Sequence, residues 1–121
     1  MKHFTKILIV LCLFCVQSIS ASVTSDVIAA FRSGYSEAIT RNLADNIELV
    51  IDNSDNIYSS QQTGRILAHF FEENPPISFK IVHQGKQENS EFVIGTLKTQ
   101  SKEYRIYFLL KNDTIQQLRI E

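Results

Sequence analysis

The sequence predicts an α+β domain in which helices come first and a run of antiparallel strands follows. Apolar residues recur at mostly helical spacing before Pro75, and they recur at every second position from Ile77 onward. With 121 residues, the chain has the length of one domain. The connections in the second part are short and polar, as hairpin loops are: Gly85 to Ser90, Gln100 to Lys102 and Asn112 to Thr114.

Residues 1–20 are predicted to form a signal peptide. Two lysines precede an unbroken apolar run from Ile7 to Val16, and small residues then follow at the spacing that a signal peptidase recognises, with cleavage after Ser20 or Ser22. The apolar run is shorter than the roughly 20 residues that cross a bilayer, so no membrane-spanning segment is expected. We expect an exported protein, periplasmic or secreted, whose single domain covers residues 23–121.

Two helices are expected at the start of this domain. Thr24 or Ser25 is expected to cap the first helix, because a hydroxyl at that position accepts a backbone N–H. Gly34 is expected to end it in a left-handed conformation, and Ser36 to cap a second, short helix. The apolar residues on one face of the first helix are Val27, Ala30 and Phe31.

A strand, a turn and a third helix follow. Residues 47–51 place Ile, Leu and Ile at every second position, which predicts a strand, and residues 52–56 are typical of a hairpin turn. Ser59 and Gln62 match a capping box, which predicts a helix that ends before Pro75. Its apolar face consists of Ile66, Leu67, Phe70 and Phe71.

Alternation assigns faces to the strands in the second part of the chain. The four strand candidates are Ile77 to Gln84, Glu91 to Thr99, Glu103 to Lys111 and Ile115 to Glu121. The residues expected to face the helices are Phe79, Ile81 and His83, then Tyr104, Ile106, Phe108 and Leu110, and finally Gln116, Leu118 and Ile120. The residues expected on the opposite face include Arg105, Tyr107, Leu109 and Lys111, with Ile115, Gln117 and Arg119.

Several of these segments resemble a known family. They are Phe70-Phe71, Asn74-Pro75-Pro76, Phe79, Val82 to Gly85, Ile94 to Leu97, Arg105 to Lys111 and Ile115 to Glu121. The chain resembles an exported Bacteroidetes family known as domain of unknown function 4783, within the nuclear transport factor 2-like (cystatin-like) superfamily. The resemblance implies a cone-shaped, curved antiparallel sheet packed on N-terminal helices, and no assigned activity. The superfamily's enzymes place Asp, His or Tyr inside the cone, and many other members bind or assemble without catalysis.

Composition and motifs exclude several classes of function. A formal net charge of −1 offers no basic surface for nucleic acid. No glycine-rich loop joins a strand to a helix, so no phosphate or dinucleotide site is expected. Both cysteines lie in the predicted signal peptide, which leaves the mature chain without a thiolate. His69 with Glu72 or Glu73 has the spacing of a metal pair but lies off the apolar face, so no metal ligand and no cofactor are assigned.

His83 is the candidate for acid–base chemistry, because an imidazole titrates near neutral pH. It is expected to lie with Phe79 and Ile81 on the concave side of the sheet, where Phe108 and Gln116 complete a predicted ligand pocket. A catalytic role requires a carboxylate or tyrosine hydroxyl within reach and an open cavity beside the ring. The structural alternative is a half-buried histidine that only bonds a neighbouring group.

Tyr107 and Leu109 are expected on the outer surface of the sheet, framed by the cations of Arg105 and Lys111. An apolar centre with a charged rim is typical of a modest interface, so we predict a homodimer, with a monomer as the alternative. We expect a non-catalytic domain that binds a small apolar ligand or a protein partner. The alternatives are an acid–base enzyme of the isomerase, dehydratase or cyclase type that uses the cone pocket, and a purely structural homodimer.

Overall fold

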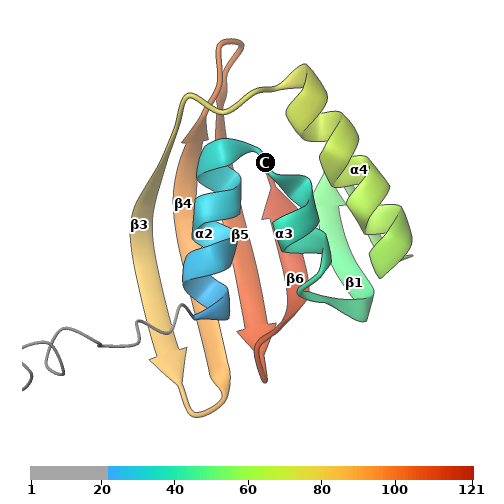
Figure 1. The fold of residues 1–121 in the computed structure, drawn as a ribbon, viewed down its shortest axis with the longest axis vertical. Coiled ribbons are helices and arrows are strands. Elements are labelled where there is room, and N and C mark those ends of the chain that lie inside the picture. The colour runs from blue at the N-terminus through green and yellow to red at the C-terminus, as the bar shows by residue number, and fades with distance from the viewer. Residues whose placement is uncertain (1–21) are drawn as a thin grey trace, which may run out of the picture.

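The computed structural model describes residues 22–121, so the predicted signal peptide lies outside the described residues. The described helices are α2 (Val23–Ser33), α3 (Ser36–Thr40) and α4 (Ser60–Glu73) (Figure 1). The strands are β1 (Leu43–Ile51), β2 (Ser54–Ser59), β3 (Ser78–Gln87), β4 (Ser90–Lys98), β5 (Glu103–Lys111) and β6 (Thr114–Ile120). None of these helices is long and apolar enough to cross a membrane.

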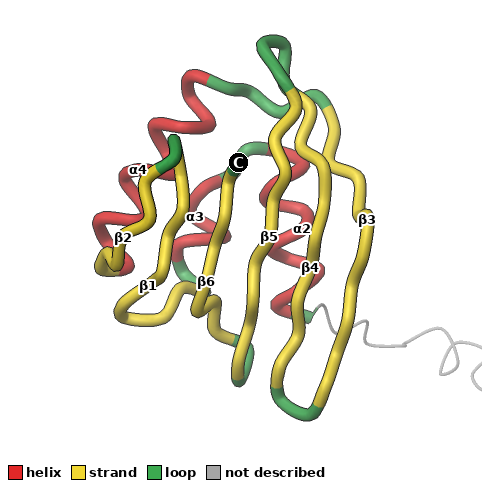
Figure 2. The backbone as a smooth tube through the Cα atoms, turned by 180° about the vertical axis from the view of Figure 1, so that it is seen from behind, coloured by secondary structure: helices red, strands yellow, loops and turns green. Residues whose placement is uncertain are grey.

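The strands form one curved sheet in the order β2-β1-β6-β5-β4-β3, and the helices pack on one of its faces (Figure 1). Neighbouring strands are antiparallel except β1 and β6, which are parallel. Seen from behind, the strands lie in front of the helices, and no described element covers that side (Figure 2). We call the helix-covered side the inner face and the other side the outer face. This arrangement confirms the predicted α+β class.

The first helix begins at a different cap from the predicted one. Ser22 is the N-cap, and its hydroxyl oxygen accepts the backbone N–H of Ser25 at 3.1 Å. Thr24 is buried, and its hydroxyl donates to Glu91 Oε2 at 2.6 Å. The side chain of Thr24 therefore joins α2 to β4 instead of capping the helix. Gly34 ends the helix with φ +76°, as predicted.

The hairpin between β1 and β2, and the start of α4, follow the predicted chemistry. Asp52 and Asn53 have φ of 52° and 62°, which is the left-handed conformation that a two-residue hairpin turn needs. The Ser59 hydroxyl accepts the N–H of Gln62, and the Gln62 side chain accepts the N–H of Ser59. The predicted capping box is thus confirmed, and α4 ends at Glu73.

Phe31 of α2 lies at the centre of the core. Its ring is stacked on that of Phe108, with centroids 5.8 Å apart and 9° between the planes. The rings of Phe79 and Phe71 lie 5.4 and 5.8 Å from it. All four side chains are buried, so aromatic rings from two helices and two strands fill the middle of the space between the layers.

A β-bulge in β3 reverses the alternation of that strand. Ile81 lies opposite Gly95 of β4. His83, two positions further on, lies opposite Ile94, which is only one position away from Gly95. Val82 is therefore the extra residue, and every side chain after it points to the face opposite the one that simple alternation predicts.

A second bulge lies in β6. Leu109 of β5 is opposite Gln117, and the next residue, Leu110, is opposite Ile115, which leaves Gln116 as the extra residue. Ile115 is fully buried, so its predicted place on the outer face is wrong. Gln116 is half-buried at the bulge. Leu118 and Ile120, beyond the bulge, are buried as predicted.

Candidate binding sites

His83 lies on the outer face and not in the predicted concave pocket. The residue opposite it, Ile94, pairs in turn with Tyr107. The His83 side chain is exposed, and its ring centroid lies 5.4 Å from that of Phe92. The predicted placement is wrong because the bulge at Val82 reverses the alternation before His83.

The other four residues of the predicted pocket occupy separate places. Phe79 and Phe108 are buried, and the ring of Phe31 packs against both. Ile81 is half-buried on β3, at the edge of the sheet, and Gln116 lies at the β6 bulge. The structure does not bring the predicted residues together around one cavity.

Apolar side chains gather on the outer face along two neighbouring strands. Phe92 and Ile94 of β4 lie opposite Leu109 and Tyr107 of β5. All four side chains are half-buried, and no described element covers this face (Figure 2). We call these four residues the outer patch. The predicted position of Tyr107 and Leu109 on the outer face is confirmed.

An open hollow of about 450 Å³ adjoins the outer patch. Two guanidinium groups, Arg105 and Arg119, and two carboxylates, Glu48 and Glu121, line it. Glu48 Oε2 accepts a hydrogen bond from Gln117 Nε2 at 3.1 Å, and Arg119 Nη1 lies 3.9 Å from Glu121 Oε1. The hollow beside the outer patch therefore carries both signs of charge in equal number.

A second candidate site lies between α4, the end of β1 and the start of β5, in a groove of about 460 Å³. We call it the α4 groove. Its floor is apolar, with Ile51 and Phe70 buried and Ile66 half-buried. Tyr104 forms one wall, where its ring meets that of Phe70 edge-on with centroids 5.0 Å apart.

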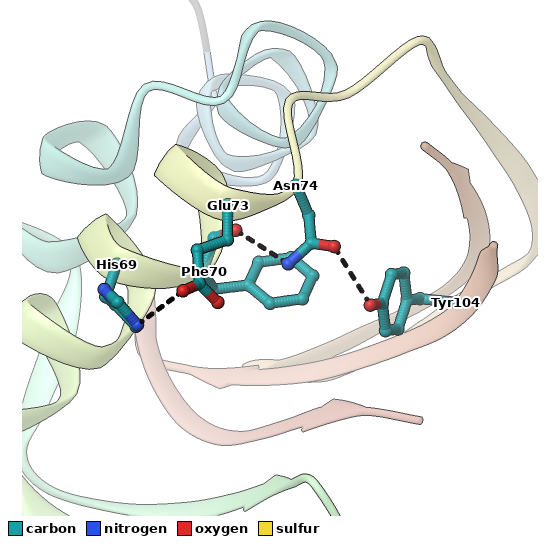
Figure 3. Close-up of polar contacts among 5 residues, drawn as sticks. All are labelled: His69, Phe70, Glu73, Asn74 and Tyr104. Carbon is teal, nitrogen blue, oxygen red and sulfur yellow. Dashed lines mark hydrogen bonds and ion pairs between the residues drawn. The ribbon is translucent and has the colours of Figure 1, made fainter. Parts of the chain in front are cut away.

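Asn74 ties the end of α4 to β5 beside this groove (Figure 3). Its Nδ2 donates to the carbonyl oxygen of Phe70 at 3.0 Å. The Tyr104 hydroxyl donates to Asn74 Oδ1 at 3.2 Å, and the Ser101 hydroxyl donates to the same oxygen at 3.3 Å. One amide side chain thus fixes Tyr104 in place, so the wall of the groove is formed before any ligand arrives.

Ionisable side chains rim the α4 groove. Arg65, His69 and Glu73 follow one stripe of α4 at four-residue spacing. His69 Nε2 lies 3.2 Å from Glu73 Oε1, with both side chains largely exposed (Figure 3). Asp52 faces this stripe from the β1–β2 turn, and neither Asp52 nor Arg65 has an ion-pair partner within residues 22–121. This part of the chain contains no cluster of three or more potential metal ligands.

Sequence reasoning missed half of the outer patch, Phe92 and Ile94, and it did not find the α4 groove. The alternation of Phe92 and Ile94 with buried Val93 was available in the sequence and could have placed them beside Tyr107. The α4 groove gave a weaker signal, because its residues come from three elements far apart in the chain. The four-residue spacing from Arg65 was visible, but the approach of the other two elements depends on the topology.

Comparison with known proteins assigns the family. The family model described as Domain of unknown function (DUF4783) matches residues 24–121. A DUF4783 protein of solved structure from Bacteroides uniformis is 33% identical, with a TM-score of 0.76, over 79% of this chain and 93% of that chain. Another, from Bacteroides fragilis, is 34% identical, with a TM-score of 0.72, over 85% of this chain and 97% of that one. A search of curated proteins gave no match.

More distant structures share the fold. An NTF-2 like protein of unknown function from Burkholderia xenovorans has a TM-score of 0.65 at 10% identity, over 82% of this chain and 78% of that chain. A likeness at this identity concerns the arrangement of helices and strands alone. The chain therefore belongs to the DUF4783 family, and its fold is of the NTF2-like type.

Proposed function

We propose that this domain is an exported, non-catalytic binding module that pairs with a second copy of itself through the outer patch. The observation that carries the proposal is the set of four neighbouring, half-buried apolar side chains on a sheet face that no described element covers. Clustered apolar surface of this kind marks interaction sites on soluble proteins. Aromatic residues such as Phe92 and Tyr107 are enriched at the centres of interfaces.

The charges around the outer patch favour a second copy over a partner of strongly one-sided charge. Arg105 and Arg119 lie beside the patch with Glu48 and Glu121, and Lys111 follows Leu109 on the same face of β5, so charges of both signs surround the patch. In a two-fold interface the same surface meets itself, and a surface that carries both signs can place a cation of one copy near a carboxylate of the other.

The composition of the interior supports binding over the enzyme alternative. That alternative needs Asp, His or Tyr inside the cone, where burial and a charged neighbour tune a proton-transfer group. Within residues 22–121, the buried polar side chains are Thr24, Thr63 and Thr99, and the half-buried Tyr104 has its hydroxyl bonded to Asn74. The space between the layers is occupied instead by the aromatic cluster around Phe31.

The proposal includes export of the protein, which the predicted signal peptide at residues 1–20 supports. Ser22 caps α2, so cleavage after Ser20 keeps the cap and cleavage after Ser22 removes it. We expect N-terminal sequencing of the protein from its own cells to begin at Ala21. An intact N-terminus in the cytoplasmic fraction would contradict export.

Sedimentation velocity over a range of protein concentrations tests the pairing. We expect the wild-type protein to dimerise and Leu109→Glu to be monomeric, because a carboxylate at the centre of the patch would be buried without a partner. The matched control is Gln61→Glu, which adds the same charge at an exposed position on α4. A wild-type protein that stays monomeric at the highest concentration, or a Leu109→Glu dimer, overturns the proposal.

A further inference from the structure

The α4 groove has the form of a small-molecule site that is independent of the outer patch. Its volume of about 460 Å³ falls within the range of ligand pockets, roughly 300–1,000 Å³. It has an apolar floor of Ile51, Ile66 and Phe70, and Asn74 holds its Tyr104 wall in place. Because it lies on the helical side of the sheet, pairing through the outer face leaves it open (Figures 1 and 2).

The charges of the groove indicate what kind of ligand it would take. Glu73 and His69 are already paired with each other at 3.2 Å. The guanidinium of Arg65 and the carboxylate of Asp52 line the same groove from opposite elements, and neither has an ion-pair partner among the described residues. One cation and one anion thus remain available above an apolar floor.

We propose that the α4 groove binds a free α-amino acid with an apolar side chain. The ligand carboxylate is bound by Arg65, whose guanidinium matches a carboxylate in geometry and charge. The ligand ammonium is bound by Asp52, and the apolar side chain packs on Ile66 and Phe70. A ligand with a single charge would pair with one of these groups and meet a like charge at the other. The groove should therefore bind the zwitterion more tightly than a ligand that carries only the carboxylate or only the ammonium group.

Binding is measured by titrating the purified, isotopically labelled protein with L-leucine and following amide resonances by NMR. The two matched probes are 4-methylpentanoate, which lacks the ammonium group, and 3-methylbutylamine, which lacks the carboxylate. We expect leucine to shift resonances of the second half of α4, the β1–β2 turn and the start of β5. Each probe should bind about tenfold more weakly or worse, because a hydrogen bond to a charged group contributes about 1.5–3 kcal/mol.

Two variants remove one charge each without disturbing the fold. Arg65→Gln keeps a good helix former on α4, and Asp52→Asn keeps a residue type that tolerates the positive φ of this turn. Each should weaken leucine binding about tenfold, and Gln61→Ala, an exposed α4 variant outside the groove, should leave it unchanged. The absence of leucine shifts at millimolar concentration, equal binding of either single-charge probe, or unaffected binding by both charge variants overturns the proposal.

Discussion

At the scale of single residues, Asn74 connects more of the molecule than its position after a helix indicates. It accepts from two side chains of the β4–β5 region and donates to the backbone of α4. Its backbone N–H also donates to the Phe70 carbonyl oxygen at 2.8 Å. The main chain and the side chain of Asn74 thus both bond the same carbonyl oxygen at the end of α4. A residue that the sequence suggests only as a break before Pro75 therefore fixes the distance between α4 and β5.

We predict that Asn74 and Tyr104 are energetically coupled. Tyr104→Phe removes the hydroxyl that donates to Asn74 while it keeps the edge-on contact with Phe70, and it should cost about 0.5–1.5 kcal/mol of unfolding free energy. Asn74→Ala should cost more, since it also removes the bond from Ser101 and the side-chain bond to the Phe70 carbonyl, which then keeps only the bond from the Asn74 backbone N–H. Urea unfolding of both variants and their double variant should give a coupling of about 1 kcal/mol. Additive costs would show that the hydrogen bond does not stabilise the fold.

At the scale of elements, the strands show where sequence patterns succeed and where they fail. The apolar face of α4 and the two faces of β5 follow from spacing alone, because both elements are regular over their full length. β2 was not predicted as a separate strand, since its side chains are largely exposed and give no apolar alternation. It forms because the Asp52-Asn53 turn reverses the chain directly onto β1.

The bulge in β3 explains why the position of His83 could not be predicted from alternation. Residues 77–84 alternate in sequence as a regular strand would, and nothing in that pattern marks Val82 as an extra residue. The ring of Phe79 fills the space above Gly95, where a Cβ atom would lie 2.5 Å from the ring. This packing keeps the side chain of Phe79 on the inner face. After the bulge, the second half of β3, whose side chains are largely exposed, pairs with β4 in a register shifted by one residue.

Removing Val82 should therefore be better tolerated than removing Lys80, two residues earlier on the same strand. Without Val82, Ile81 and His83 become neighbours and face Gly95 and Ile94 in a regular ladder. Without Lys80, Phe79 and Ile81 become neighbours and one of them must leave the inner face, which costs about 3–5 kcal/mol where the buried ring of Phe79 is the one lost. Urea unfolding compares the two deletions. Equal destabilisation would mean that the bulge is needed for folding and is not merely an inserted residue.

At the scale of the whole molecule, one strand contributes to two different surfaces through its two faces. The inner side chains of β5 complete the core around Phe31, and the outer ones form half of the outer patch. The sheet separates these surfaces by a single layer of backbone, and the helices cover only one of them (Figures 1 and 2). Neighbouring residues in the sequence are thus expected to control different equilibria, folding for one and association for the other.

This separation predicts opposite behaviour for Phe108→Ala and Leu109→Ala. Phe108 is fully buried, so its truncation should cost about 3–5 kcal/mol and lower the melting temperature at every protein concentration. Leu109 is half-buried on the outer face and outside the core, so its truncation should leave the monomer folded and weaken mainly pairing. Association stabilises a folded dimer by mass action, so the wild-type melting temperature should rise with protein concentration, and that of Leu109→Ala should rise less. Calorimetry at several concentrations measures both effects. A wild-type melting temperature that does not change with protein concentration would show that the outer patch does not mediate pairing.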